Sequence, residues 1–289
     1  MTEFHADDFG FFTAQSRRIL QCREDGALNG ISVFPNGDEL ADCLALLPDH
    51  SPALTVHLNL MLGHCLAAPS SVPLLADQNG IFCVSFGELL FCPFFGKRDA
   101  YKQQLKEELS AQIHALQPVF QEKNLPLRID GHAHWHMIPV VFDALMEVIR
   151  DERLPVSYIR IPAEPVSVYW KNFFRILPFP PINIIKSVLL SILAKINRRR
   201  WNCLISQMEE HVFLGVLLSG CFDLRRMQAV LSDAESLAKK RGCGLELLAH
   251  PGAVLEKKDI DRVTNESDRR FFTSPARAWE ADGLMHIHE

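Results

Sequence analysis

The chain has 289 residues, of which 48% are hydrophobic and 22% charged, a composition typical of a globular protein with a sizeable core. Its 30 basic and 35 acidic residues give a formal charge of -5, so the chain lacks the overall positive charge of a nucleic-acid-binding protein. The length suits one large α/β domain or two small ones. We expect a single domain over residues 1–289.

The predicted elements alternate between strands and helices in chain order. A first strand ends in HADDFG (5–10), and further strands are predicted at 31–37, 53–60, 126–136, 156–162 and 244–252. Helices are predicted at 13–30 (with Thr13 as its cap), 38–47, 100–120, 139–152 and 223–242. The strand at 126–136 is expected to run into a loop, and 63–100 to be a long excursion with little regular structure.

A strand followed by a helix recurs along much of the chain, and this rhythm favours a parallel sheet or a (β/α) barrel. In such folds the chemistry gathers at the C-terminal ends of the strands. The histidine-bearing motifs of this sequence lie at or near those ends.

The segment 169–201 is strongly apolar, yet Lys186 and Lys195 interrupt it, and its charge-free run 176–185 is about half of the roughly 20 residues that a membrane span needs. We expect a helix packed on the barrel or at a subunit interface, such as that of a homodimer. The alternative is a peripheral membrane contact that helps the protein reach a lipid-linked substrate, aided by the basic run Arg198–Arg200.

The eight cysteines form no C-x-x-C pair, which argues against a zinc–cysteine site and favours buried, reduced thiols. Only four residues precede HADDFG, too few for a signal peptide. A cytoplasmic location, or one peripheral at the membrane, is therefore expected.

The stretch DGHAHWHMIP places Asp130, His132, His134 and His136 at alternating positions, so an extended chain would point them to one face. In a helix, His132 and His136 would still share a face. Three histidines within five residues after an aspartate are hard to explain by packing alone. We therefore predict a metal-binding or catalytic role for at least one of them.

Imidazole combined with carboxylate suits a divalent first-row metal, with zinc preferred and magnesium or another divalent ion as alternatives. Asp8, His57 and His132 would supply one carboxylate and two imidazoles from three strand ends. Asp7 could then accept a proton from water activated by the metal, and the ion would relieve the repulsion between the two aspartates. His250, in the LLAHPG stretch, could donate a proton to a leaving amine or stabilise an oxyanion.

The motifs HADDFG, VHLNL, DGHAHWHMIP and AHPG, in this order, resemble the YdjC-like carbohydrate deacetylases over nearly the whole chain. The resemblance implies a deformed (β/α) barrel related to the polysaccharide deacetylases. It also implies a divalent metal and hydrolysis of an N-acetyl group from an amino sugar. By position it implies Asp8, His57 and His132 as ligands, Asp7 as base and His250 as acid.

The same resemblance matches Arg160 to an arginine that orients the base or binds substrate. His134 and His136 are expected to line the sugar pocket or to hold the metal-ligating side chains in place through hydrogen bonds. Two residues depart from the family pattern: His5 replaces an asparagine, and Gly131 replaces the commoner serine. Because it adjoins the site, His5 is expected to influence substrate choice.

Two other classes remain open at this point. A metal-dependent phosphoesterase or another amidohydrolase would use the same ligands, and a non-catalytic sugar- or lipid-binding protein would need no base. The pair Asp7 and Asp8 together with His250 argues against the second of these classes. Free chitooligosaccharides, nucleotide sugars, lipid-linked glycans and hopanoid-linked amino sugars are all compatible with the motifs.

Overall fold

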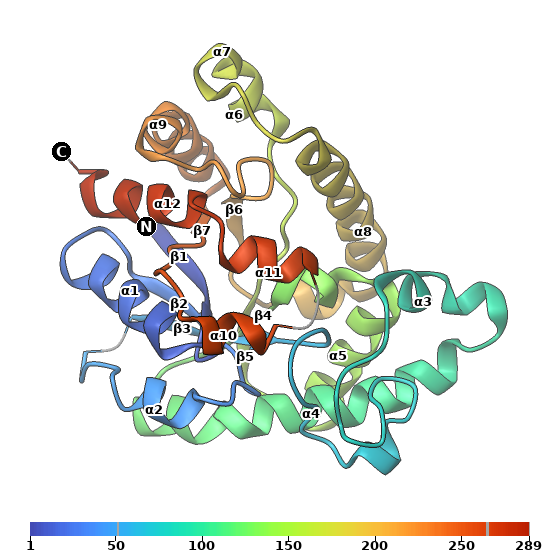
Figure 1. The fold of residues 1–289 in the computed structure, drawn as a ribbon. Coiled ribbons are helices and arrows are strands. Elements are labelled where there is room, and N and C mark those ends of the chain that lie inside the picture. Colours follow the sequence, from blue (N-terminus) through green and yellow to red (C-terminus); the bar gives the residue numbers. More distant parts are fainter. Residues whose placement is uncertain (51, 264–265, 289) are drawn as a thin grey trace.

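Seven parallel strands form one sheet in the computed structural model, which describes residues 1–50, 52–263 and 266–288. Their order across the sheet is β5-β4-β3-β2-β1-β7-β6, so the first strand lies near the centre. The sheet curls into an open half-barrel with helices around its outside (Figure 1). The deformed (β/α) barrel predicted from the sequence is therefore confirmed.

The strands are β1 Thr2–Phe9, β2 Gly30–Val33, β3 Ala53–Leu58, β4 Leu127–Gly131, β5 Val156–Ile159, β6 His211–Leu214 and β7 Gly244–Ala249. The longer helices are α1 Thr13–Glu24, α4 Arg98–Glu122, α5 Pro139–Asp151, α8 Pro181–Ile205, α9 Leu224–Arg241 and α12 Ala276–His286. Shorter helices are α2 Leu40–Leu44, α3 Phe86–Phe91, α6 Val166–Lys171, α7 Phe173–Ile176, α10 Lys257–Asp261 and α11 Glu266–Phe272. Within the described residues there are also three 3-10 turns, η1 Pro69–Ser71, η2 Cys92–Phe95 and η3 His132–Met137.

The two faces of β1 carry different chemistry, as the alternation of side chains along a strand requires. Phe4 and Ala6 are buried in the main hydrophobic core. Glu3, His5 and Asp7 point to the inside of the curled sheet, where they meet charged and polar side chains of other strands. The inside of the barrel is therefore polar, while the helices pack on its apolar outer face.

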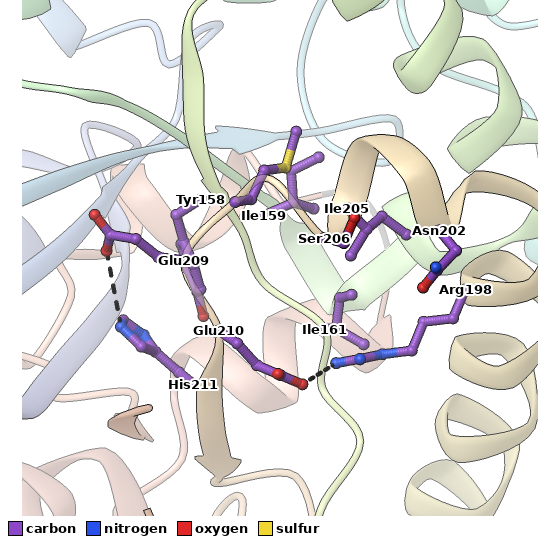
Figure 2. A pocket seen from close by; sticks show the side chains of 11 residues that line it. Tyr158, Ile159, Ile161, Arg198, Asn202, Ile205, Ser206, Glu209, Glu210 and His211 are labelled. Atoms are coloured by element: carbon purple, nitrogen blue, oxygen red, sulfur yellow. Dashed lines mark hydrogen bonds and ion pairs between the residues drawn. The ribbon is translucent and has the colours of Figure 1, made fainter. Parts of the chain in front are cut away.

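The two edge strands approach each other without forming a strand pair among the described residues. The rings of Tyr158 in β5 and His211 in β6 lie 4.6 Å apart, and Glu209 N–H donates to Ser157 O at 2.8 Å. A cavity of about 280 Å³ lies at this seam. Figure 2 shows residues that line it, among them Tyr158, His211 and Arg198 of α8. The seam is where the barrel stays open.

Most predicted elements are found, with several corrections. Strand β6 and the helices α10, α11 and α12 were not predicted. The helix at 13–30 ends at Glu24, and Thr13 is not its cap: its hydroxyl donates to Glu39, and Phe12 holds the cap position without a side-chain bond. The excursion at 63–100 contains α3, which starts with a capping box on Ser85. All eight cysteines are free, but the expectation that they are all buried is wrong, since Cys83 and Cys203 are exposed.

Candidate metal centre and active site

Asp7 and Asp8 reach the same site although neighbouring residues of a strand normally point to opposite faces. The register between β1 and β2 shifts between Ala6 and Phe9, as at a β-bulge. At this break Asp8 adopts a φ of 73°, in the left-handed region. This local turn aims the Asp8 carboxylate at the mouth of the barrel and leaves Asp7 in line with His5.

Asp8, His57 and His132 form a buried cluster whose potential ligand atoms all lie within 4.8 Å of one another. Asp8 Oδ1 is 3.2 Å from His132 Nδ1 and 3.7 Å from His57 Nε2. Asp8 Oδ1 and His57 Nε2 are buried and have no hydrogen-bond partner among the described residues. Buried polar atoms rarely stay unpaired, so a cation between them is the simplest partner.

The tautomer of His57 supports this assignment. On β3, His57 lies in register with Asp130 of β4, and its Nδ1 donates to Asp130 Oδ1 at 2.7 Å. The lone pair of Nε2 is then free to face Asp8, as in a carboxylate–histidine–metal arrangement. Ser32 O–H donates to the other oxygen of Asp130 at 2.5 Å, which holds that carboxylate in place.

Two further groups of side chains are also compact enough to hold an ion, namely Glu3 with His5 and Glu246, and His5 with Asp7 and Asp130. Their atoms already have partners: His5 contacts Glu3 and Ser32 through its two ring nitrogens, each at 2.6 Å. The unpaired atoms therefore favour the first cluster, Asp8 with His57 and His132, as the group that could hold an ion. His5 is not among the residues that line the nearby cavity, and its influence on substrate choice stays a prediction.

The histidine motif is not extended, contrary to one of the two predicted arrangements. Strand β4 ends at Gly131, and η3 follows, with Ala133 and His134 in the left-handed region at φ 48° and 60°. A side chain at Gly131 would have its Cβ 2.9 Å from His136 Nδ1, so serine would crowd this turn. The turn sends the three histidines in different directions.

Each histidine of the motif has its own surroundings. His132 belongs to the cluster with Asp8 and His57, and His134 lines the cavity. His136 is buried, its Nε2 donates to the Arg160 carbonyl at 2.8 Å, and it is not among the residues that line the cavity. Burial lowers the pKa of His136 to about 4, although the hydrogen bond to the Arg160 carbonyl opposes this shift. Burial and the charge of Arg160 lower the pKa of His134 well below its usual value.

Arg160 is fully buried beneath Asp7. Its Nη1 donates to both Asp7 oxygens at 2.9 Å and lies 2.6 Å from Asp130 Oδ2, while its Nε donates to Glu246 Oε1 at 2.7 Å. Of the two roles expected for Arg160, orienting Asp7 fits this geometry, and direct contact with substrate does not. Glu246 is not among the residues predicted from the sequence, although a charged residue inside the apolar strand sequence GLELLA indicates a buried polar contact.

The C-terminal helices complete the site with residues that the sequence did not reveal. Arg277 of α12 donates through both terminal nitrogens to Asp8 Oδ2 at 3.2 Å, which leaves Oδ1 to face the histidines. Glu280 of the same helix accepts from the His250 backbone N–H at 2.6 Å and lies 3.6 Å from its Nδ1. Asp268 of α11 lines the cavity with one carboxylate oxygen buried and unpaired.

Charge around the cluster favours a cation there. Burial alone would raise the pKa of Asp8, but the proximity of His132 and the charge of Arg277 hold this pKa well below its usual value. Burial opposes a charge on His57, yet the carboxylates of Asp130 and Asp7 raise its pKa. The position beside His57 is therefore stabilised for positive charge, either a proton or a metal ion.

A cavity of about 400 Å³ opens onto this cluster. Asp7, Asp8, His132 and His250 all line it, so the predicted base, acid and two ligands face one space. Its other walls are largely apolar and come from η3, α3, α8 and α11, with Trp135, Phe86, Leu189 and Phe271 among them. The size and lining suit a small organic substrate held by apolar faces and a few polar groups.

A sequence profile described as "YdjC-like protein" matches residues 3–286. The chain belongs to this family. Among its relatives, a carbohydrate deacetylase of Mus musculus is 28% identical over 160 residues, 55% of this chain and 49% of that protein. A carbohydrate deacetylase of Geobacillus stearothermophilus is 29% identical over 175 residues, 59% of this chain and 66% of that protein.

A chitooligosaccharide deacetylase of Yersinia pestis is 28% identical over 158 residues, 54% of this chain and 58% of that protein. The chain thus aligns with about half to two thirds of the length of these YdjC-like relatives. The fold also resembles the crystal structure of a putative cellobiose-phosphate cleavage protein from Enterococcus faecalis. The TM-score is 0.64 at 17% identity, covering 98% of this chain and 90% of the other. That likeness concerns the fold alone.

Proposed function

We propose that this protein is a metal-dependent hydrolase that removes the N-acetyl group from an amino sugar. The observation that carries the proposal is the position of Asp7, which faces the cavity directly beside the unpaired ligand atoms of Asp8 and His57. The names of the deacetylase relatives agree with this chemistry.

Asp8, His57 and His132 fit a divalent ion by donor type and by their unpaired buried atoms, and zinc suits their nitrogen-rich set better than magnesium. When bound, such an ion polarises the acetyl carbonyl and makes a nearby water a better nucleophile. Arg277 supports the site from the opposite side of Asp8 by fixing which of its oxygens faces the histidines.

Asp7 accepts the proton of the attacking water. Its two oxygens are held by one guanidinium nitrogen of Arg160, so the carboxylate cannot rotate away from the cavity. His250, held by Glu280 and by an edge-to-face contact with Phe271 at 5.2 Å, donates a proton to the departing amine. The products are acetate and the free amino sugar.

The cavity lining favours an amino sugar over a phosphate ester. Trp135 and Phe86 offer apolar faces of the kind on which a pyranose ring stacks. Lys186 is the single Lys or Arg among the described residues that line this cavity, whereas a phosphate site usually gathers several cations. A metal-dependent phosphoesterase on the same barrel is therefore the weaker alternative.

The test is acetate release from a panel of N-acetylated mono- and oligosaccharides by the metal-loaded protein, with and without a chelator. We expect release that stops with the chelator, returns with zinc and is lost in the Asp7→Asn variant. The exposed Trp279→Ser variant is the matched control and should keep its activity, because Trp279 is not among the cavity residues. Chelator-sensitive phosphate release without acetate release would overturn the proposal.

A further inference from the structure

One side of the protein exposes an unusual number of large apolar side chains. Trp170 of α6 is 76% exposed, Phe174 of α7 is 87% exposed, and Ile185 of α8 is 64% exposed. Figure 1 shows the three helices together along one side of the molecule. We call this surface the α6–α8 face; its exposed apolar members are Val166, Trp170, Phe173, Phe174, Ile182, Ile184, Ile185, Val188 and Ile192.

Helix α8 is apolar on two opposite sides. Leu190, Leu193 and Ala194 are buried against the barrel. Ile185, Val188 and Ile192, spaced three and four residues apart, lie together on the outward side and are each at least half exposed. A helix that packs on its protein through one face normally presents polar residues on the other. The outward apolar stripe is therefore without a partner in the single chain.

The charge of this region differs from that of the whole protein. Residues 166–205 contain seven Lys or Arg and no Asp or Glu, although the full chain carries a net charge of -5. Lys171, Arg198 and Arg200 pair with acidic residues elsewhere. The other four have no ion pair within the described parts of the chain: Arg175, Lys186, Lys195 and Arg199.

The α6–α8 face borders the substrate cavity. Lys186, Leu189 and Leu190 of α8 line the cavity. The exposed Ile185 and Val188 are direct neighbours of two of them in the sequence of the helix. On α3, Phe86 also lines the cavity, and this segment continues into Phe91, Phe94 and Phe95, which are 51%, 82% and 73% exposed. Apolar surface thus extends outward from two walls of the cavity.

We propose that the α6–α8 face docks on the surface of an anionic lipid bilayer. Exposed aromatic and aliphatic side chains with unpaired cations beside them are the chemistry that binds an interface of acyl chains and anionic headgroups. A second copy of the chain fits less well, because a two-fold interface through this face would bring like charges together. No helix within the described residues is long and apolar enough to cross a membrane, and α8 with its internal lysines lies on the surface.

Co-sedimentation of the full chain with phosphatidylcholine vesicles, with and without phosphatidylglycerol, tests this inference independently of the proposed reaction. We expect binding to the anionic vesicles that weakens as salt rises. The Lys195→Glu/Arg199→Glu variant should bind at least tenfold more weakly, since each cation near an anionic surface is worth roughly a fivefold change. Phe174→Ser combined with Ile185→Ser should also weaken binding by about tenfold or more.

Two exposed positions outside the α6–α8 face supply matched controls. Arg17→Glu on α1 and Trp279→Ser on α12 change the same types of residue and should bind like the unchanged protein. Equal binding to neutral and anionic vesicles, or no binding to either, would overturn the inference. It would also be overturned if the protein formed a dimer that the variants of the α6–α8 face abolished while vesicle binding stayed unchanged.

Discussion

Replacing Arg160 should destabilise the whole barrel, because this guanidinium neutralises three buried carboxylates. Its nitrogens lie 2.9 Å from both Asp7 oxygens, 2.6 Å from Asp130 and 2.7 Å from Glu246. Removing one partner of a buried ion pair costs about 3–5 kcal/mol, since the other charge stays buried without compensation. Arg160→Met should therefore lower the free energy of unfolding by at least about 3 kcal/mol, a large part of the roughly 5–15 kcal/mol of a typical domain.

Urea unfolding followed by circular dichroism measures this change in the free energy of unfolding, with Arg160→Lys and Arg270→Met as comparison variants. Lysine keeps the charge but lacks the fork that reaches several carboxylates at once, so it should lose about 1–3 kcal/mol. Arg270 pairs with Glu266 on the surface, where both side chains are more than two-thirds exposed, and should change stability by less than about 1 kcal/mol. An Arg160→Met variant as stable as Arg270→Met, with an unchanged urea dependence, would refute the reasoning.

Two other predictions follow from the interior and from the cavity. Burial would raise the pKa of Glu3, but its contacts with His5 and Arg128 lower this pKa from 4.5 to about 2. Ionised Glu3 therefore stabilises the fold fully above about pH 4.5, and this stabilisation is lost as the pH falls toward 2. The free energy of unfolding of Glu3→Gln should therefore be about 3 kcal/mol lower than that of the unchanged protein at pH 7, and the difference should shrink at pH 3. A difference that does not depend on pH would contradict this prediction. His250→Ala should lower kcat for acetate release by about 10²–10⁴-fold with little change in KM, whereas a change confined to KM would remove the acid role.

The sequence predicted correctly which residues lie close together where a short motif placed polar side chains at the end of a strand. Asp7, Asp8 and His57 were predicted from short motifs, and parallel strands bring such ends together whatever the intervening loops contain. The prediction that Asp8, His57 and His132 meet holds in the geometry, since their ligand atoms lie within 4.8 Å of one another.

Residues far from these motifs could not be predicted in the same way. Arg277 bonds to Asp8 across 269 positions of sequence, and nothing in the surrounding ARAWEADG marks it as part of a site. The turn after β4 depends on two residues in the left-handed region, Ala133 and His134, and alanine rarely adopts this conformation.

Metal content measured beside turnover tests the central claim most directly. We expect the unchanged protein to bind one zinc ion per chain after dialysis, Asp8→Asn to lose most of both metal and activity, and Asp7→Asn to keep the metal while losing turnover. Binding of zinc by Asp8→Asn with the affinity of the unchanged protein, or full activity of Asp7→Asn, would contradict the account.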